Sequence, residues 1–474
     1  MQVKLCKGFW RVAAIALFAL SGTQIGWAQT KNIILMIGDG AGFQCWHVAS
    51  MYQGRWDAAQ RRSTQVYDGP GWLPLACSTH PLNTSPRPTG LGVQDPQVVY
   101  DPAKAWSGAA ATTWLKAAYT DSAAAATALA TGQKTYDKAI NWSDWDEVIW
   151  PTITELAKAR GKSVGIITSV QWSHATPAGL SHARSRDRDD YESIANQMLT
   201  GDVLDVIMGC GNPDYDDNGQ SRLKKKEYKY VGGEPTWRAM EAARATPNGR
   251  YRGFRPVSTK AEFEALARGP TPQRVLGTAQ VAQTLQQVRT AGNPHDPAHD
   301  APLNESVPTL ATMTRGALNV LDDNPQGLFL MVEGGAIDWA NHNNQPGRMI
   351  QEQSGFFEAI EAVVQWVESH SNWQDTLLIL TADHETGLLW GPKSDTEPFD
   401  PLLDHGQGQL PGLRYNSKSH TNSLVPLFVK GAGSEHFASL VVGVDPVRGS
   451  YVTNTAVFEV MHRSMLMRSV ASEH

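Results

Sequence analysis

The sequence predicts an α/β protein with a large, mostly parallel central sheet and helices on both faces. Two observations predict this fold. Short, fully apolar runs that end in turn residues recur along the chain, as is typical of buried parallel strands. Alanine-rich or amphipathic segments, which favour helices, lie between several of these runs. Because ligands of such sheets bind beyond the carboxyl ends of the strands, the residues after each run are candidates for a functional site.

Five runs are expected to be strands. In chain order they are NIILMIGDG (32–40), SVGIITS (163–169), GLFLMVEGG (327–335), TLLILTADHETG (376–387) and LVPLFVKG (424–431). Helices are expected between them, for example over WPTITELAKARG (150–161) and FFEAIEAVVQWVES (356–369). The chain has 474 residues, of which 41% are hydrophobic, so it can bury this core in one large domain with insertions.

Acidic and histidine side chains mark the ends of these runs. They are Asp39, Glu333, Asp383 and His384 at strand ends, His420 just before the last strand, and the polar segment WSHATPAG (172–179) after the second. Each alone is most simply a turn residue or a helix cap. Four marked strand ends that converge on one edge of a sheet predict a ligand site instead.

The donor types in this set suit metal ions. Asp338 and His342 are four residues apart, so they share a face if their segment is helical, and this pairing suits zinc. A surface Asp–His hydrogen bond is the alternative. Asp39, Thr176 and Glu333 supply the oxygen donors that magnesium prefers. The sequence therefore holds donors for two transition-metal positions and one magnesium position.

Ser122 stands directly before four alanines in the segment YTDSAAAAT (119–127). The simple interpretation is a helix N-cap, for which Ser and Asp are common choices. Beside two metal ions, which are the usual machinery for displacement at phosphorus, a serine at a helix N-terminus can instead be the nucleophile. The alanines would let the helix pack closely and leave the hydroxyl open to substrate.

Six motifs in this order resemble the alkaline phosphatase family. They are GDGAG, TDSAAAATALATG, HATPAG, MVEGGAIDWANHNN, TADHETG and SHTNSLVPLFVKG, and the resemblance runs with gaps from about Lys31 to Gly433. It implies hydrolysis of phosphate monoesters through a phosphoserine on Ser122, with two Zn²⁺ ions and one Mg²⁺ ion. It also implies an alkaline optimum.

The resemblance implies a ligand set for each ion. The sets are Asp338, His342 and His420 for the zinc ion that activates water; Asp39, Asp383 and His384 for the zinc ion beside Ser122; and Asp39, Thr176 and Glu333 for magnesium.

Substrate-binding residues follow from the same resemblance. An arginine should hold two phosphate oxygens, and the motif SHARSRDRDDY places Arg186 there, with Arg184 and Arg188 as alternatives. Asp121 should position that arginine. His174, near the magnesium position, and Trp339, near the phosphate, occupy positions that vary within the family. Because Trp339 replaces a cation found in relatives, we expect weaker retention of phosphate.

Two segments fit the family poorly and are expected to be insertions, at about 210–305 and 391–418. The first should be rich in loops with short helices, and the second could form a lid or a dimer contact. Within the first, Asp214, Asp216 and Asn218 open a possible Ca²⁺ loop. Lys225 stands where the closing Glu should be, so an ordinary turn is the favoured interpretation.

Residues 1–28 have the composition of a signal peptide. A basic start precedes the short apolar run VAAIALFAL, and Gly26 and Ala28 suit cleavage after about Ala28. A membrane-anchoring helix is the alternative. Export predicts a periplasmic or secreted protein, with residues 29–474 forming one catalytic domain. No other run is long enough to span a membrane, so none is expected after cleavage.

Charge and cysteine content limit the partners. The formal charge of −6 and the lack of a long basic stretch argue against specific nucleic-acid binding. Cys45, Cys77 and Cys210 would remain in an oxidising compartment, where one disulfide is possible, but the sequence does not define its pairing. A homodimer is possible. Small phosphate monoesters are the expected substrates.

Other functions were weighed against this one. A sulfatase would need a Cys or Ser followed by x-Pro-x-Arg, whereas alanines follow Ser122. A related phosphodiesterase would typically use threonine, and a cofactor-independent phosphoglycerate mutase would lack a signal peptide. The alternative outside enzymology is a secreted, metal-stabilised binding protein with an inactive site.

Overall fold

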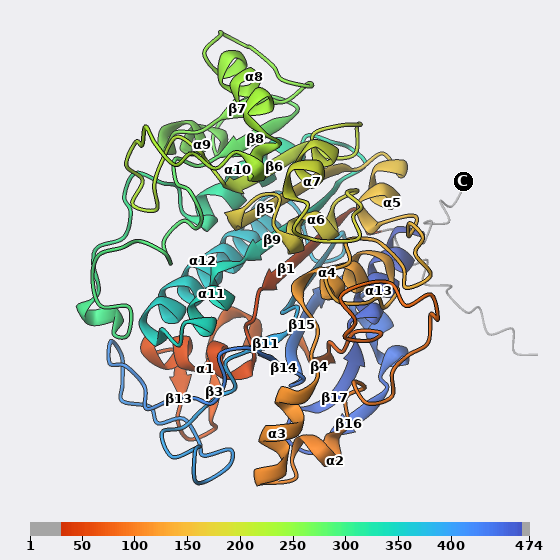
Figure 1. Ribbon diagram of the computed structural model, residues 1–474, viewed down its shortest axis with the longest axis vertical. Coiled ribbons are helices and arrows are strands. Elements are labelled where there is room, and N and C mark those ends of the chain that lie inside the picture. The colour runs from red at the N-terminus through yellow and green to blue at the C-terminus, as the bar shows by residue number, and fades with distance from the viewer. Residues whose placement is uncertain (1–29, 467–474) are drawn as a thin grey trace, which may run out of the picture.

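One sheet of eleven strands forms the centre of the molecule (Figure 1). The computed structural model describes residues 30–466, so the predicted signal peptide lies outside the described residues. The strands, in spatial order, are β16 (Gly443–Asp445), β17 (Gly449–Thr453), β4 (Leu73–Ser78), β15 (Val425–Gly431), β10 (Thr376–Thr381), β1 (Asn32–Gly38), β9 (Leu328–Gly334), β5 (Ser163–Gln171), β6 (Val206–Cys210), β8 (Val275–Thr278) and β7 (Arg255–Val257). The predicted α/β fold is confirmed.

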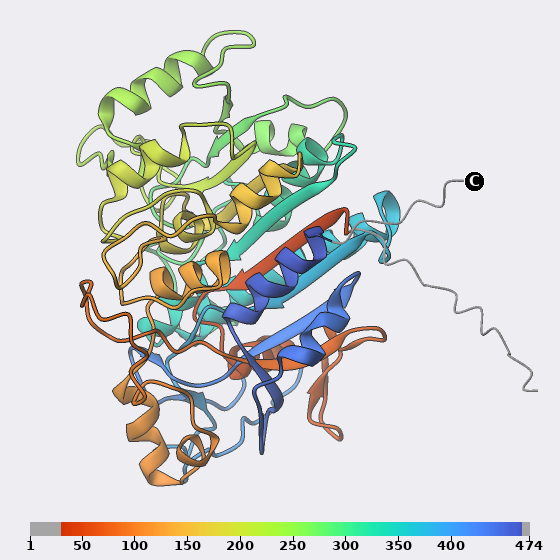
Figure 2. The same cartoon turned by 90° about the vertical axis from the view of Figure 1, so that its right-hand side faces the viewer.

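Helices cover both faces of this sheet (Figure 1), and Figure 2 looks onto one of these faces, with helices in front of the strands. On one face α4, α5, α6 and α13 pack against one another, and on the other α1, α9, α10, α11 and α12 do so. The helices are α1 (Phe43–Tyr52), α2 (Pro102–Ala105), α3 (Ala109–Ala117), α4 (Ser122–Thr131), α5 (Ile153–Ala159), α6 (Ala175–Leu180), α7 (Tyr191–Met198), α8 (Glu234–Arg244), α9 (Lys260–Leu266), α10 (Leu310–Leu321), α11 (Ala336–His342), α12 (Pro346–His370) and α13 (Thr455–Leu466).

Short elements complete the chain. The 3₁₀ turns are η1 (Val66–Asp68), η2 (Lys229–Val231), η3 (Pro297–His299) and η4 (Ser434–Leu440), and the two-residue strands are β2 (Trp56–Asp57), β3 (Arg62–Ser63), β11 (Glu385–Thr386), β12 (Leu389–Trp390), β13 (Arg414–Tyr415) and β14 (His420–Thr421). No helix among residues 30–466 combines the length and apolar character needed to cross a bilayer.

The direction of β15 differs from the four other predicted strands. β1 pairs in parallel with β9 and β10, and β5 pairs in parallel with β9, but β15 runs antiparallel to β10, with Thr381 opposite Leu427. The start of β15 therefore lies at the edge where the parallel strands end. This reversal brings His420, which precedes β15, to the same edge as Asp39 and Asp383.

The segment 210–305 is more than a loop-rich insertion. It contributes β7 and β8, which extend the sheet beyond β6 in parallel pairing. These strands have only three and four residues, too short to stand out as apolar runs in the sequence.

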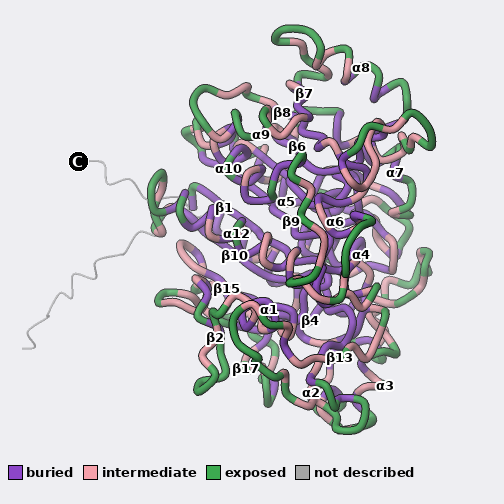
Figure 3. The backbone as a smooth tube through the Cα atoms, turned by 90° about the vertical axis from the view of Figure 1, so that its left-hand side faces the viewer, coloured by how far each residue is buried: buried purple, intermediate pink, exposed green. Residues whose placement is uncertain are grey.

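The core lies along the central strands and the helices against them. Every residue of β1 and β9 is buried, and Figure 3 shows the buried backbone concentrated through the middle of the molecule. Cys45, Cys77 and Cys210 are all buried in this core and free, so the possible disulfide is not formed.

Candidate active site

Ser122 is the first residue of α4, and Asp121 is the N-cap. The Asp121 Oδ1 atom accepts a hydrogen bond from the Ala124 amide at 2.9 Å. Because the aspartate caps the helix, the neighbouring serine hydroxyl is not needed for capping. Its Oγ atom instead lies 3.1 Å from Nε2 of His384.

The alanines of α4 allow close packing against α6. All ten residues of α4 are buried, and a Cβ atom added at Gly179 would lie 2.6 Å from the Cβ atom of Ala126. Larger side chains at either position would push the two helices apart. This packing fixes the N-terminus of α4 beside the start of α6, which carries Thr176.

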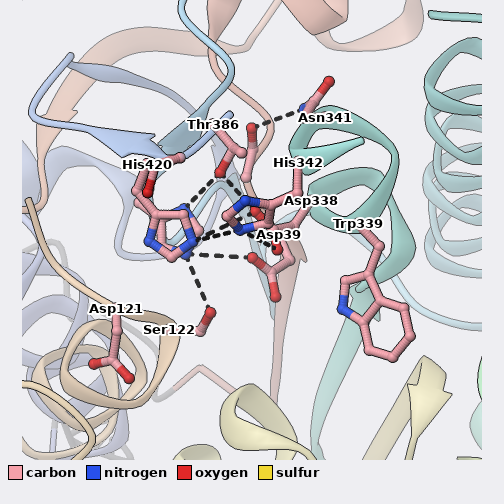
Figure 4. Close-up of polar contacts among 12 residues, drawn as sticks. Asp39, Asp121, Ser122, Asp338, Trp339, Asn341, His342, Thr386 and His420 are labelled. Atoms are coloured by element: carbon pink, nitrogen blue, oxygen red, sulfur yellow. Dashed lines mark hydrogen bonds and ion pairs between the residues drawn. The ribbon is translucent and has the colours of Figure 1, made fainter. Parts of the chain in front are cut away.

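One group of ligand candidates gathers around Asp338. Asp338 and His342 lie on one face of α11, as predicted, with 3.3 Å between Asp338 Oδ2 and His342 Nε2. The Nε2 atom of His420 lies 3.6 Å from Asp338 Oδ1 and 3.1 Å from His342 Nε2. Figure 4 shows these side chains converging above Ser122. Three side chains from two distant segments of the chain thus face one small volume.

A second group lies beside the first. Nε2 of His384 lies 3.5 Å from Asp39 Oδ1 and 3.2 Å from Asp383 Oδ2. Gly40 allows this approach: its φ is +68°, and a Cβ atom there would lie 2.7 Å from Asp338 Oδ1. A side chain at position 40 would therefore separate the two groups.

Glu333 and Thr176 form a third, oxygen-rich position. Glu333 ends β9 and Thr176 lies in α6, and both are fully buried. The Thr168 hydroxyl donates a hydrogen bond to Glu333 Oε2. Burial raises the pKa of Glu333 to about 7, although the Thr168 and Thr176 hydroxyls oppose that rise.

The electrostatics of these groups call for a cation. The buried oxygens Asp39 Oδ1, Asp383 Oδ2 and Glu333 Oε1 have no hydrogen-bond donor among residues 30–466. Burial and the nearby Asp383 carboxylate raise the pKa of Asp39 well above its ordinary value, and burial and Asp338 raise that of Asp383 to about 8. Buried carboxylates normally pair with cations or bind metals, so this donor set fits metal ions.

Histidine orientation supports the same interpretation. The Nδ1 atom of His342 donates to the Lys418 carbonyl oxygen at 2.6 Å, and that of His420 donates to the Thr120 carbonyl oxygen at 2.8 Å. In its neutral form each ring would present an unprotonated Nε2 atom to the site, the form that binds metal. Without an ion, the effect of burial on the pKa of His342 is outweighed by the Asp338 carboxylate, which raises that pKa to about 9. The Thr386 hydroxyl donates to Asp338 Oδ1 at 2.6 Å and holds that carboxylate in place.

Arg188, rather than Arg186, is the arginine beside the serine. Arg188 Nη1 donates to Asp121 Oδ2 at 3.0 Å, and its side chain is largely buried. Arg186 is exposed and binds Asp146 through two hydrogen bonds, with its guanidinium carbon 4.8 Å from the centre of the Trp142 ring. Asp121 thus pairs with Arg188 and not with the predicted Arg186, so Arg188 is the better placed of the two to bind a ligand beside Ser122. The chain bends at Arg186, which turns that side chain towards Asp146 and solvent.

His174 and Trp339 lie side by side near these groups. Their ring centroids are 5.6 Å apart, and Figure 4 shows Trp339 leaving α11 beside the cluster rather than in it. Burial and then Arg188 lower the pKa of His174 to about 3, so its ring is neutral. Arg188 thus supplies the positive charge on this side of the site.

The side chains of the possible calcium loop are bound by donors of the chain itself. Asp214 binds Lys226 and the Trp237 indole, and Asp216 Oδ1 accepts the amides of Asn218 and Gln220. This pattern favours the ordinary turn that the sequence suggested over a Ca²⁺ site. The groups that could hold an ion among residues 30–466 are Asp338 with His384 and His420, and Asp39 with Asp383 and His384.

Comparison with known proteins agrees with the motifs. The sequence profile of the alkaline phosphatase family matches residues 101–440. The chain belongs to the alkaline phosphatase family. Alkaline phosphatase H of Pseudomonas aeruginosa is 29% identical over 452 residues, covering 88% of this chain and 83% of that protein. Alkaline phosphatase 4 of Bacillus subtilis is 32% identical over 276 residues, covering 56% of this chain and 50% of that protein.

A solved alkaline phosphatase has the same fold. The cold-active alkaline phosphatase of a psychrophilic Shewanella superposes with a TM-score of 0.62 at 25% identity, covering 92% of this chain and 99% of that one. The chain spans about half the length of the two Bacillus subtilis relatives it matches. The family resemblance read from the six motifs is confirmed.

Proposed function

We propose that the protein is an exported, metal-dependent phosphomonoesterase that works through a phosphoserine at Ser122. The observation that carries this proposal is the position of the Ser122 hydroxyl, 3.1 Å from His384 Nε2 and at the N-terminus of α4. A hydroxyl placed between candidate metal ligands and a buried arginine is suited to attack on a phosphate ester.

The proposed ligand sets follow the groups described above. Asp338, His342 and His420 would hold one zinc ion; Asp39, Asp383 and His384 a second; and Asp39, Thr176 and Glu333 a magnesium ion. When bound, these ions would lower the pKa of the serine hydroxyl and of water and would stabilise the charge on the leaving oxygen.

The side chains of the protein would carry the remaining tasks. Arg188 would bind two phosphate oxygens through its planar guanidinium, and Asp121 would fix the orientation of that group. Ser122 Oγ would then form a bond to phosphorus as the bond to the ester oxygen breaks and the alcohol leaves. Water would cleave the resulting phosphoserine to release inorganic phosphate. The free amides at the start of α4 favour the anion throughout.

Trp339 and His174 would shape product release. Both are uncharged beside the phosphate position, so Arg188 would hold phosphate there without a second cation from either residue. Weaker retention of phosphate would speed its departure.

Hydrolysis of 4-nitrophenyl phosphate tests the proposal. We expect turnover by the parent protein, loss after EDTA treatment and recovery with zinc and magnesium. Ser122→Ala should lose at least about a thousandfold in kcat, while Ser369→Ala, at the exposed end of α12, should match the parent. A Ser122→Ala protein that keeps the parental rate would rule out the covalent route. Metal binding without turnover of any monoester would favour the binding-protein alternative.

Export is part of the proposal because residues 1–28 have the composition of a signal peptide. N-terminal sequencing of the protein recovered from the periplasm or medium should begin near residue 29. Recovery of uncleaved chain in the membrane fraction would favour the anchoring helix instead.

A further inference from the structure

A second cavity lies next to the loops that carry the candidate metal ligands. It has a volume of about 450 Å³ and is formed by α1, the β2–β3 hairpin, the segment 399–404, Trp390 of β12 and the β16–β17 turn. Figure 3 shows α1 beside β2 in the lower part of the molecule. None of the candidate ligands, Ser122 or Arg188 lines this cavity, so it is separate from the proposed active site.

Arg448 is the central charged group of this cavity. Its guanidinium carbon lies 4.3 Å from the centre of the Phe43 ring, 5.7 Å from that of Trp390 and 5.9 Å from that of Trp106. Within residues 30–466 its side chain makes no hydrogen bond and no ion pair. Burial lowers its pKa to about 10, only partly offset by Asp445, so the group is charged at neutral pH but poorly compensated.

The nearby carboxylate of Asp445 is already used by other donors. Its Oδ2 atom accepts hydrogen bonds from the Tyr100 hydroxyl at 2.7 Å and the Trp106 indole at 2.8 Å. Its Oδ1 atom accepts the backbone amides of Val447 and Arg448. The five N–H groups of the Arg448 guanidinium therefore remain available to a ligand.

The rest of the lining combines positive charge with flat apolar walls. Arg61 also lines the cavity and has no ion pair within the described part of the chain, while Asp404 is the one carboxylate on its wall. Burial, then Arg448 and Arg61, lower the pKa of His47 to about 3, so its ring is neutral. Rings of Trp56, Trp390 and Phe399 complete the wall. The lining is thus net positive and aromatic.

We propose that this cavity binds a small anion that carries a flat aromatic ring, such as an aryl carboxylate or an aryl phosphate. The anionic group would pair with Arg448 and Arg61, and the ring would stack on Trp390 and Phe399. The volume lies within the range of small-molecule sites, and a few polar groups on an apolar wall are typical of them. The guanidinium fork suits either anion.

Calorimetric titration with 2-naphthoate and with a naphthyl phosphonate, which cannot be hydrolysed as an ester, tests the proposal. Each titration is repeated with Arg188→Gln protein, in which binding to the proposed active site should weaken while binding to this cavity should not change. We expect one saturable site, and the tighter of the two probes identifies the anionic group that the cavity prefers.

Substitutions in the lining test whether the probe binds in this cavity, and thermal unfolding tests whether a variant remains folded. Arg448→Gln and Trp390→Leu should each weaken the preferred probe at least tenfold, while Arg87→Gln, an exposed arginine outside the cavity, should leave it unchanged. Thermal unfolding and turnover of 4-nitrophenyl phosphate by Arg448→Gln should match the parent. If Trp390→Leu unfolds, Arg448→Gln and Arg61→Gln still decide the result.

Two results would overturn the proposal. One is the absence of saturable binding of either probe, or equal binding by Arg448→Gln. The other is a second copy of the chain seated over the cavity through the exposed rim residues Leu403 and Val447. In that case light scattering would show a dimer that Leu403→Asp separates, and the probes would bind only the separated form.

Discussion

Two buried clusters of charge in this protein are built in opposite ways. Asp300 lies between Arg289 and Arg348, with its Oδ2 atom 2.8 Å from Arg289 Nη2 and 2.6 Å from Arg348 Nε. Its Oδ1 atom accepts a hydrogen bond from Arg348 Nη2 at 3.0 Å and another from the Ala301 amide. Both carboxylate oxygens are satisfied by the chain itself.

The cluster at the carboxyl ends of the strands lacks such partners. Asp39, Asp383 and Glu333 each keep a buried oxygen without a hydrogen-bond donor within the described chain. His384 lies between them, but burial and then His420 lower its pKa well below the ordinary value, so its ring is neutral. The comparison teaches that burial of acids is not itself a sign of a metal site. Unsatisfied oxygens around neutral imidazoles are the distinguishing feature.

Removal of one carboxylate from each cluster should give the largest difference in stability between the two clusters. Asp300→Asn would remove the carboxylate that forms ion pairs with both buried arginines, so it should destabilise the protein by about 3–5 kcal/mol. At pH 9, above the pKa of about 8 of Asp383, Asp383→Asn should instead stabilise the metal-free protein, because it removes a repelling charge. Urea unfolding in EDTA would measure both. Destabilisation by Asp383→Asn as large as that by Asp300→Asn would contradict the distinction.

Metal removal should affect one cluster and not the other. Ions at about a thousand times their dissociation constant would stabilise the folded state by about 4 kcal/mol. EDTA should therefore lower the melting temperature, and zinc with magnesium should restore it. An Asp383→Asn and His384→Ala double variant, which lacks two ligands of one proposed zinc ion, should show a smaller response to EDTA than the parent. An equal response in that variant would place the stabilising ions elsewhere.

Arg186 and Arg188 show the same difference between a charged group that is fully paired within the chain and one that can still bind a ligand. Arg188 is paired with Asp121 yet keeps further N–H groups for a ligand, whereas Arg186 is occupied by Asp146. Arg188→Gln should reduce kcat/KM for 4-nitrophenyl phosphate by about 10²–10³-fold. Arg186→Gln is the matched control and should stay within about twofold of the parent. The reverse ranking would restore Arg186 as the phosphate ligand.

The smallest expected effect is the one that Glu352 has on the pH dependence of stability. It is buried beside Arg289 and Arg348, yet burial outweighs their attraction and raises its pKa from 4.5 to about 7. The folded state therefore favours the protonated form, and stability falls as pH rises from about 4.5 to 7 and is then constant. Glu352→Gln should remove this fall, a gain of about 1–3 kcal/mol at pH 8 and little at pH 4. Equal effects at both pH values would show that Glu352 titrates normally.

The sequence indicates candidate ligands where a metal-binding side chain directly follows a predicted strand. The five apolar runs are all strands of one sheet, and the i, i+4 spacing of Asp338 and His342 does place them on one helical face. These features follow from local periodicity and from the rule that parallel strands end at one edge.

Features that depend on distant contacts could not be read in this way. Arg184, Arg186 and Arg188 lie in one short motif, and only the pairing of Arg186 with Asp146 and of Arg188 with Asp121 separates them. The strands β7 and β8 are too short to recognise, and the direction of β15 is set by pairing rather than by its own residues. The acidic turn at 214–218 resembles a calcium loop until Lys226 and Trp237 are known to occupy Asp214.

The reversed strand β15 also sets an order of events during synthesis. His420, which completes the Asp338 group, leaves the ribosome only after the parallel strands β1, β5, β6, β7, β8, β9 and β10 have been made. A nascent chain therefore carries Asp39 from early on, but the proposed ligand set is complete only when the later segment has paired back along β10. Newly made chains would thus lack the full proposed ligand set until most of the parallel strands exist.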